Sequence, residues 1–322
     1  MKVFVAGGSG AVGRRLVPQL VAAGHQVVAT TRSGRNRESL EALGAEPEVF
    51  DGLDERAVRE AVGRAEPEVV IHEMTGLSGA INLRRFDHWF ATTNELRTKG
   101  ADYLIRAAQL AGARRLIAQS YTGWSNIREG GRIKDEDDPL DPNPPAAMRQ
   151  TLSGIRHLER AVVGAEGLEG LALRYGSLYG PGTSTSEQFP ELLRKRRMPL
   201  IGDGAGVWSF IHVDDAASAT VLALERGEPG VYNVVDDEPA PASEWLPYLA
   251  DALGARPPWR LPVWLGRLAA GEVAVSTMTR IRGSSNAKAK RELGWRPRYG
   301  SWREGFRDGL REGPVPARAP EG

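Results

Sequence analysis

Short apolar, β-branched runs alternate with longer stretches of helical periodicity along the first 120 residues. The short runs are typical of strands that are buried on both faces of a parallel sheet. Between them, apolar residues recur at helical intervals, as at Leu16, Val17, Leu20 and Val21. We expect strands over 2–6, 27–31, 49–51, 68–72 and 115–120, and helices over 14–23, 55–62 and 94–111. Strands that alternate with helices need right-handed crossovers, so the pattern predicts an α/β fold with a doubly wound parallel sheet.

The alternation continues for a further stretch and then breaks. The segment 135–145 is too rich in proline and acidic residues for regular structure and is expected to be a surface loop. We expect a helix over 147–163, a strand over 170–175, a basic helix over 187–197, a helix that ends at Glu225 and a strand over 231–235. From residue 176 onward the regular order of strand and helix is lost.

Glycines recur every three residues directly after the first predicted strand, at Gly7, Gly10 and Gly13. Between a strand and a helix, such glycines permit a tight turn, let the backbone approach a pyrophosphate and let the helix pack closely on the strand. The N–H groups and the dipole of the helix N-terminus favour the anion. An ordinary turn is the alternative, but the context favours dinucleotide binding. The residues assigned to it here are Gly7, Ser9, Gly10, Ala11, Val12 and Gly13.

The end of the second predicted strand carries Arg32, with Arg35 and Arg37 after it. In dinucleotide-binding folds, an acidic residue at this point binds the ribose 2′-hydroxyl, whereas an arginine accommodates a 2′-phosphate. No acidic residue lies beside Arg32. A solvated arginine-rich loop is the alternative interpretation. We expect NADP(H) to be preferred, with NAD(H) as the second candidate.

Composition narrows the classes of function. The 322 residues suit one large α/β domain, with or without a smaller one attached. Lys and Arg total 42 against 41 Asp and Glu, and no basic stripe indicates nucleic acid or an anionic membrane. The absence of cysteine excludes disulfides, thiolate metal sites and cysteine nucleophiles, and the five histidines form no metal-binding pair. The chain begins on a predicted core strand and has no long apolar run, so we expect a soluble cytoplasmic protein.

Ligands of parallel sheets bind at the carboxyl ends of the strands. This places the segment 7–13, Arg32, Asp51, the segment 74–76 and Ser120 along one edge. His72, at the end of the fourth strand, is expected to be structural rather than catalytic.

A series of motifs, each loose alone, resembles the extended short-chain dehydrogenase/reductases of the epimerase/dehydratase type over essentially the whole chain. They are, in order, the three glycines, Asp51, Ser120, Arg174 with Tyr179-Gly180-Pro181-Gly182, Gly202-Asp203-Gly204, His212-Val213-Asp214-Asp215, Tyr232-Asn233-Val234 and Leu293-Gly294-Trp295. The resemblance implies a Rossmann domain over 1–175, to which 208–235 returns. It also implies a smaller substrate domain made of 176–207 and 236–322.

The resemblance and the sheet edge together assign further cofactor-binding residues. They are Asp51, Gly52, Leu53, Met74, Thr75, Gly76, Asn94, Ser120, Met148, Leu152, Tyr175, Gly176, Ser177 and Leu178.

The family's acid/base pair is missing. Family enzymes carry Tyr-x-x-x-Lys on the helix after the fifth strand, which puts both side chains on one helix face. The ammonium lowers the pKa of the phenol and holds the nicotinamide ribose, and the phenol exchanges a proton with the substrate. Alignment of 144–152 places Met148 at the tyrosine and Leu152 at the lysine, and no tyrosine of the chain has a lysine four residues later. Either another register applies or the pair is absent.

Other groups are candidates for the chemistry. Ser120 aligns with the family's serine that hydrogen-bonds a substrate carbonyl, and Tyr121 is the nearest hydroxyl that could replace the lost phenol. Neighbouring residues of a strand point to opposite faces of the sheet. Ser120 and Tyr121 can therefore both contact one substrate only if the chain makes an irregular turn at the end of this strand. Glu73 is a weaker candidate.

Trp208 stands where many nucleotide-sugar enzymes of the family carry an arginine, so the substrate is expected to be apolar or aromatic. Trp259 and Trp264 support this expectation, and packing within or between domains is the alternative for all three.

Three hypotheses of function follow. The first is an NADP(H)-dependent oxidoreductase for a small metabolite with an unusual proton donor. The second is a non-redox lyase, isomerase or dehydratase, and the third is a catalytically silent protein that senses NADP(H). A change in absorbance at 340 nm during turnover separates the first from the others. A homodimer through the helix over 147–163 is an open alternative to a monomer.

Overall fold

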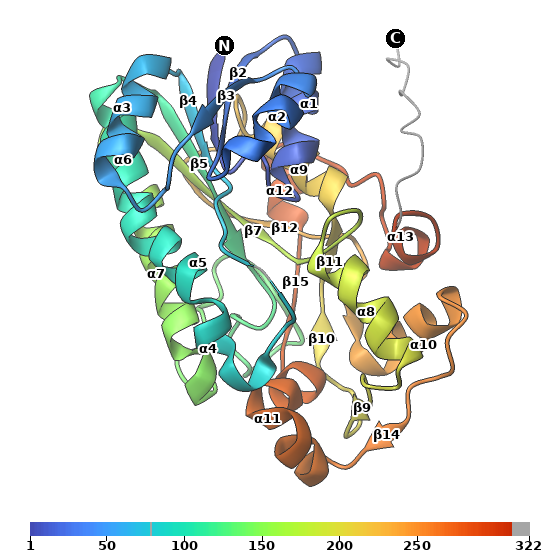
Figure 1. Ribbon diagram of the computed structural model, residues 1–322. Helices are drawn as coiled ribbons and strands as arrows, with labels where there is room; N and C mark the ends of the chain where they lie inside the picture. The colour runs from blue at the N-terminus through green and yellow to red at the C-terminus, as the bar shows by residue number, and fades with distance from the viewer. Residues whose placement is uncertain (78, 311–322) are drawn as a thin grey trace.

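The structure, a computed structural model, describes residues 1–77 and 79–310. Its centre is a seven-stranded sheet whose neighbouring strands are all parallel (Figure 1). Across the sheet, the strands are β12 (Gly230–Val234), β7 (Glu169–Tyr175), β5 (Arg115–Tyr121), β4 (Val69–His72), β1 (Lys2–Ala6), β2 (Gln26–Thr31) and β3 (Glu46–Val49). The strand order reverses between β1 and β4, which is the topology of a Rossmann sheet and confirms the predicted fold class.

Strand β1 shows why this sheet is buried on both faces. Val3 and Val5 lie in one apolar cluster together with Leu16 of α1, whereas Phe4 lies in a second cluster with Val58 of α3. Successive side chains of a strand point to opposite faces, so a continuous apolar run serves two cores. The first face is covered by α1 (Gly13–Ala22), α2 (Arg37–Ala42), α9 (Val213–Leu222) and α12 (Ala287–Glu292), and the second by α3 (Glu55–Ala65), α6 (Ala101–Leu110) and α7 (Arg149–Val163).

The third strand lies earlier than predicted. β3 covers Glu46–Val49 rather than 49–51, and Phe50 and Asp51 follow it. Pro47 is compatible with this strand because β3 is at the edge of the sheet, where a missing N–H is tolerated.

The single helix predicted over 94–111 is interrupted. α5 (Ala91–Glu95) leads through one π-helical turn, Leu96–Gly100, into α6. The carbonyl of Leu96 accepts a hydrogen bond from Nε2 of His72 at 3.0 Å, while Nδ1 of His72 accepts one from the backbone N–H of Met74. Burial lowers the pKa of His72, so the ring is neutral and structural, as predicted. Such π turns are rare and occur mostly near functional sites.

A second group of elements lies below the sheet in Figure 1 and encloses a third apolar cluster around the buried Trp245 and Trp302. Its helices are α8 (Ser184–Arg194), α10 (Ala242–Ala252), α11 (Val263–Thr279) and α13 (Trp302–Asp308). Short strands pair as β8 (Ser177–Tyr179) with β11 (Phe210–His212), β9 (Leu200–Ile201) with β14 (Arg260–Leu261), β10 (Val207–Trp208) with β13 (Ala240–Pro241), and β6 (Ile133–Lys134) with β15 (Gly283–Ser284). Residues 311–322 of the expected substrate domain lie outside the described residues.

Short helical turns complete the fold at η1 (Gly34–Asn36), η2 (Leu83–Arg85), α4 (Phe86–Trp89) and η4 (Ala146–Met148). The helix predicted over 147–163 therefore begins with a 3₁₀ turn and becomes α-helical only at Arg149. Among the described residues, no helix is both long and apolar enough to cross a membrane.

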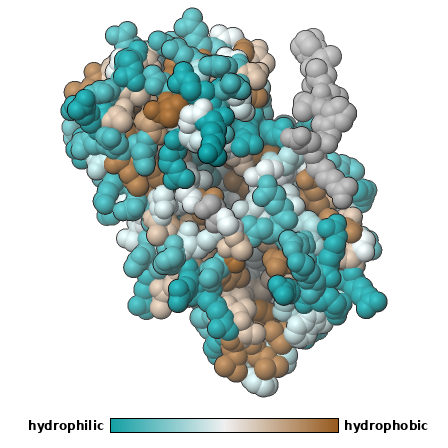
Figure 2. All heavy atoms as spheres, viewed as in Figure 1, coloured by the Kyte–Doolittle hydropathy of each residue, from teal (hydrophilic) through white to brown (hydrophobic). Residues whose placement is uncertain are grey.

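Apolar surface gathers at the lower tip of the molecule, over α11 (Figure 2). Two of the tryptophans considered for substrate binding are exposed in this region, Trp259 by 42% and Trp264 by 62%. Trp259 packs in part against the end of α8, since its Nε1 donates to the carbonyl of Arg196 at 3.1 Å, and contact of either tryptophan with substrate stays a prediction.

Candidate active site

The loop that connects β1 to α1 has no room for side chains at two of its glycines. Gly7 has a φ of 98°, and a Cβ there would lie 2.6 Å from the carbonyl carbon of Glu73. A Cβ at Gly13 would lie 2.5 Å from the carbonyl oxygen of Gly7. At Gly10, a Cβ would meet only that same oxygen, at 3.3 Å. Gly10 therefore faces space that a ligand can enter, as a dinucleotide-binding loop requires.

The backbone at the start of α1 offers donors to such a ligand. Within the described residues, the N–H groups of Ala11, Val12 and Gly13 make no hydrogen bond. The Ser9 hydroxyl donates to Oγ1 of Thr31 at 3.1 Å and so fixes the loop against the end of β2. Free N–H groups at the positive end of a helix dipole suit a pyrophosphate, so this loop fits the dinucleotide.

Arg32, Arg35 and Arg37 follow β2 and are all exposed. In the part of the chain that the structure describes, none of their guanidinium groups makes a hydrogen bond or ion pair. Three exposed arginines therefore follow β2, and recognition of a 2′-phosphate by Arg32 stays a prediction.

Two turns at the ends of β3 and β4 hold further residues assigned to the cofactor. The carboxylate of Asp51 accepts from the N–H of Leu53 at 3.0 Å, and Asp51 itself is exposed. Gly52 is buried, and a Cβ there would lie 2.4 Å from the Met74 sulfur. The two turns therefore meet, in line with the prediction that both lie at the carboxyl edge of the sheet.

Thr75 is exposed beside Gly76, whose N–H donates to Oγ1 of Thr93 at 3.0 Å. Asn94, the next residue of α5, donates through Nδ2 to Thr151 on α7 at 3.1 Å, and its Oδ1 is buried without a described partner. The turn after β4 is therefore tied to α5, and α5 to α7.

Tyr121 ends β5 and meets a residue that the sequence placed in the cofactor site. Its hydroxyl lies 3.0 Å from Oγ of Ser177, and its ring stacks on Trp124 with centroids 5.4 Å apart. Burial raises the pKa of Tyr121 to about 12, so the phenol keeps its proton at neutral pH.

The backbone from Tyr175 to Leu178 is committed to strand pairing. Gly176 donates to the carbonyl of Val234 at 3.1 Å, and Ser177 donates to that of Ser209 at 2.8 Å. A cofactor role of these four residues stays a prediction.

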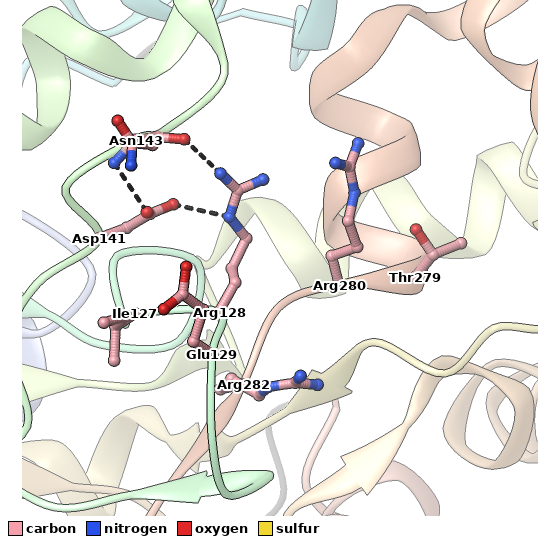
Figure 3. A pocket seen from close by; sticks show the side chains of 8 residues that line it. All are labelled: Ile127, Arg128, Glu129, Asp141, Asn143, Thr279, Arg280 and Arg282. Atoms are coloured by element: carbon pink, nitrogen blue, oxygen red, sulfur yellow. Dashed lines mark hydrogen bonds and ion pairs between the residues drawn. The ribbon is translucent and has the colours of Figure 1, made fainter.

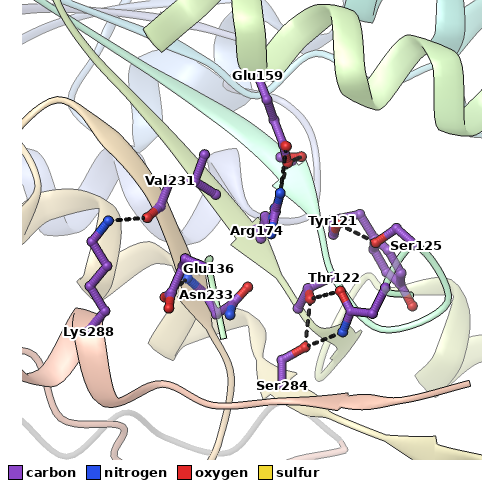
Figure 4. Close-up of polar contacts among 12 residues, drawn as sticks. Tyr121, Thr122, Ser125, Glu136, Glu159, Arg174, Val231, Asn233, Ser284 and Lys288 are labelled. Carbon is purple, nitrogen blue, oxygen red and sulfur yellow. Dashed lines mark hydrogen bonds and ion pairs between the residues drawn. The ribbon is translucent and has the colours of Figure 1, made fainter. Parts of the chain in front are cut away.

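Ser120 is fully buried and belongs to a network with the charged pair of Glu159 and Arg174, which Figure 4 shows. Its hydroxyl donates to Oε1 of Glu159 at 2.7 Å. Arg174 binds the same carboxylate with two hydrogen bonds, from Nε at 2.7 Å and from Nη2 at 2.8 Å. For Ser120 to donate to a substrate carbonyl, its hydroxyl must leave Glu159, and its catalytic role stays a prediction.

The loop after β5 is anchored by a second polar network (Figure 4). Oγ1 of Thr122 lies 2.6 Å from Oγ of Ser284 and donates to Asn126, whose Nδ2 in turn donates to Ser284. Because Ser284 belongs to β15, the loop that carries Trp124 is held by the C-terminal part of the chain.

Met148 and Leu152 are buried together in an apolar cluster. Both are at most 1% exposed, and the cluster also contains Phe86, Phe90 and Trp124. Tyr121 and Trp208 pack against it. The two side chains therefore share one face, as their spacing predicted, and neither can transfer a proton; their place beside the nicotinamide stays a prediction.

Trp208 lies where this cluster meets the core of the second group of elements. Its Nε1 donates to the carbonyl of Thr277 at 2.9 Å, and its ring lies 4.9 Å from that of Trp245. Trp208 thus serves packing here, and contact with substrate stays a prediction.

Glu73 is a buried acid that the sequence marked as a weak candidate. It is 4% exposed, one oxygen accepts from the hydroxyl of Tyr175 at 2.8 Å, and the other has no described partner. Burial raises the pKa of Glu73 to about 8, so the carboxyl is neutral at pH 7.

We predict that Glu73→Gln removes a pH dependence of stability. Between pH 4.5 and 8 the folded state keeps a proton on Glu73 that the unfolded state has released, so stability falls as pH rises through this window. The amide has no such proton, and the variant should be more stable than wild type by about 1–3 kcal/mol at pH 7.5. Urea unfolding from pH 5 to 8.5 checks this, with the exposed Glu38→Gln as control. Equal slopes in wild type and Glu73→Gln would contradict it.

Sequence reasoning missed Arg97, which is 6% exposed on the π turn and has a buried Nη1 without a described partner. It also missed a separate pocket of about 320 Å³ between the loop after β5 and the end of α11 (Figure 3). Three arginines line this pocket, and Arg128 is paired with Asp141 at 2.8 Å. Arg128 comes from a part of the chain distant from Arg280 and Arg282, so no local motif marks the pocket.

A family model for the NAD dependent epimerase/dehydratase family matches residues 3–234. The chain belongs to this family. Members bind NAD(H), and relatives of the chain include reductases and epimerases.

One relative in this family is a 3-diazoavenalumate denitrifying reductase from a Streptomyces species. It is 43% identical over 311 residues, which cover 95% of this chain and 99% of the relative. A 4-hydroxy-2-methyl-3-oxo-4-farnesyl-3,4-dihydroquinoline-1-oxide ketoreductase from Stigmatella aurantiaca is 28% identical and covers 92% of both chains.

Solved structures agree on the fold. UDP-glucose 4-epimerase from Thermus thermophilus, in complex with NAD, superposes with a TM-score of 0.72 and 25% identity over 96% of this chain and 98% of that one. The same enzyme from Thermotoga maritima, with UDP-glucose, gives a TM-score of 0.75 at 22% identity over 96% and 97%.

Proposed function

We propose that this protein is an NADP(H)-dependent reductase that replaces the diazo group of a small aromatic substrate by hydrogen, with release of N₂. The observation that carries the proposal is the burial of Met148 and Leu152 in one apolar cluster, two hydrocarbon side chains that we align with the family's proton-transferring tyrosine and lysine. The denitrifying reductase at 43% identity supports the class of substrate.

Reduction of a ketone and replacement of a diazonium group by hydrogen differ in their need for a proton. Reduction of a ketone to an alcohol consumes a hydride and a proton, and an acid must lie near the carbonyl oxygen. Replacement of a diazonium group consumes a hydride alone. The C–N bond breaks, N₂ leaves with that electron pair, the hydride supplies the pair of the new C–H bond, and the positive charge passes to the oxidised cofactor. An active site with hydrocarbon side chains at the positions aligned with the proton-transferring pair suits this balance.

Each part of the proposed site would have a separate role in binding or in catalysis. The glycine loop would hold the pyrophosphate, and the nicotinamide, when bound, supplies the hydride. The aromatic side chains Phe86, Phe90 and Trp124 would form an apolar wall for the substrate ring. Tyr121, which keeps its proton, would contact the substrate without transferring one. We assign 1–175 and 208–235 to the Rossmann domain, which would hold the cofactor and contribute this aromatic wall, and the remainder to the substrate domain on the other side of the cleft.

The test is turnover of 4-carboxybenzenediazonium with NADPH. We expect one NADPH oxidised at 340 nm for each benzoate formed, and with NADPH deuterated at the transferred position we expect deuterium on the ring carbon. Heat-inactivated protein measures the uncatalysed reaction, and a parallel panel holds 3-oxo esters and other ketones.

Three results would overturn the proposal. Reduction of ketones without loss of N₂ would make the protein a ketoreductase like the Stigmatella relative. Product formation without net oxidation of NADPH would make it a non-redox enzyme. Tight cofactor binding without turnover on the panel would favour the sensing role.

We predict that the protein binds NADPH about ten- to hundredfold more tightly than NADH. A charge-assisted contact of the exposed Arg32 with the 2′-phosphate is typically worth about 1.5–3 kcal/mol. Fluorescence titration should show this preference in wild type and its loss in Arg32→Ala. The control Arg59→Ala removes an exposed arginine from α3, and this variant should still bind NADPH more tightly than NADH. Equal affinities for both cofactors in wild type would end the claim.

We also predict a gain of function when the missing pair is restored. The double variant Met148→Tyr, Leu152→Lys should bind cofactor more tightly by at most about 1–2 kcal/mol, through the ammonium and the ribose hydroxyls. It should gain weak ketone reduction, because a general acid typically contributes 10²–10⁴-fold, but not full activity, because the surroundings are not shaped for it. Calorimetry and ketone turnover measure both effects. Unchanged affinity and no ketone reduction, in a folded variant, would show the register to be wrong.

A further inference from the structure

Arg97 is a buried charge next to the candidate active site. It lies in the π turn between α5 and α6 and is 6% exposed. Its guanidinium carbon lies 5.6 Å from the ring centroid of Phe90, which belongs to the apolar cluster around Met148 and Leu152. Buried arginines are normally paired with an anion.

The carboxylate of Glu159 already accepts hydrogen bonds from other residues. Glu159 is the acid that acts electrostatically on Arg97, but its two oxygens accept hydrogen bonds from Arg174 and Ser120. Among the described residues, no carboxylate lies within 4 Å of the guanidinium of Arg97, and its Nη1 is buried without a hydrogen-bond partner. An unpaired buried cation costs several kcal/mol of desolvation, which a bound anion would offset.

The place of Arg97 separates it from the pyrophosphate site. Arg97 interacts electrostatically with Tyr121, at the carboxyl end of β5. In the sheet, β4 lies between β5 and β1, so the glycine loop is two strands away, about 10 Å. Arg97 therefore belongs to the part of the site where the substrate would bind. Burial lowers the pKa of Arg97 to about 10, which leaves the group cationic at neutral pH.

We propose that Arg97 binds an anionic oxygen group, a carboxylate or phenolate, of an aromatic substrate whose ring packs against Phe90 and its neighbours. A guanidinium presents parallel N–H groups that match a carboxylate, and the aromatic wall suits a flat apolar ring. This inference names the substrate class of the proposed function and rests on it only for the identity of the reacting group.

Equilibrium binding tests it without turnover. The protein loaded with NADP⁺ is titrated with cinnamate, with 4-nitrophenolate and with the neutral isostere cinnamamide, by calorimetry at pH 8. For wild type we expect at least one of the two anions to bind ten- to hundredfold more tightly than the amide. Arg97→Gln should abolish that difference, and Arg97→Lys should retain part of it. The control Lys99→Gln removes an exposed cation from the same π turn and should bind like wild type.

The outcomes separate the two proposals. Equal binding of anions and amide by wild type, or preserved anion preference in Arg97→Gln, would overturn the role of Arg97 whatever the enzyme does. Anion binding that depends on Arg97, in a protein that removes no diazo group, would leave this inference standing and overturn the function. Circular dichroism and the affinity for NADP⁺ show whether Arg97→Gln is folded. If it is not, the comparison of anion and amide in wild type and Arg97→Lys decides.

Discussion

Gly10→Val is expected to abolish dinucleotide binding, with a loss of more than about 100-fold in affinity, while the protein stays folded. In the structure, a Cβ at Gly10 meets only the carbonyl oxygen of Gly7, at 3.3 Å, so a small shift of that one atom should let the fold accommodate a side chain there. The two methyl groups of valine would instead fill the space through which the backbone approaches the pyrophosphate. Calorimetry with NADPH measures the loss, and the thermal midpoint reports on the fold.

The control uses a glycine whose environment is also open. Gly63 lies exposed on α3, and a Cβ there meets nothing within 4 Å. Gly63→Val should bind cofactor like wild type. Binding by Gly10→Val at wild-type affinity would show that the glycine turn serves only the fold, whereas an unfolded Gly10→Val would contradict the claim that the fold tolerates the side chain.

The sheet and the glycine loop could be predicted from sequence because both depend on local patterns. A strand that is buried on two faces needs an uninterrupted apolar run, as in Lys2–Ala6, and the helix that covers it needs apolar residues at helical spacing. The turn between them needs glycine, since Gly7 adopts a positive φ and Gly13 touches the backbone. Each of these requirements acts within about 15 residues of chain.

The errors arose where tertiary context overrides such patterns. The strand at 46–49 contains Pro47, a residue that is rare inside strands, and the edge position of β3 makes it acceptable. The π turn at Leu96–Gly100 follows from a contact between the Leu96 carbonyl and His72, which lie 24 residues apart. The local pattern of apolar residues predicts neither the edge position of β3 nor the π turn.

The charged part of the site was missed although a signal exists. Arg97 lies on a stripe of α5 and α6 whose other members, Thr93, Ala101 and Leu104, are all buried. Glu159 interrupts the buried stripe of α7 in the same way. A charge on an apolar face marks a buried ion or a ligand contact, but its partner cannot be read from the sequence. Arg174, which pairs with Glu159, reaches it from β7.

This buried pair is also the basis of the largest expected effect on stability. Arg174→Met should lower the free energy of unfolding by about 3–5 kcal/mol, because it leaves the carboxylate of Glu159 buried and unpaired. Both partners are less than a tenth exposed, and Ser120 alone would remain as a donor to the carboxylate. The exposed pair of Arg56 and Glu60 on α3 provides the control, since Arg56→Met should leave the free energy of unfolding nearly unchanged. Urea unfolding of both variants gives the comparison.

The double variant Arg174→Met, Glu159→Leu separates the cost of an unpaired charge from the cost of lost packing. With both charges removed, no ion is left without a partner, and apolar replacement of a buried pair is often neutral or stabilising. The Ser120 hydroxyl loses its acceptor in this variant, at a cost of about 1–3 kcal/mol, so recovery should be large but incomplete. A double variant as unstable as Arg174→Met would show that the guanidinium acts through its packing against β5 and α7. A double variant clearly more stable than Arg174→Met would show that the network is held by charge balance rather than by the packing of the guanidinium.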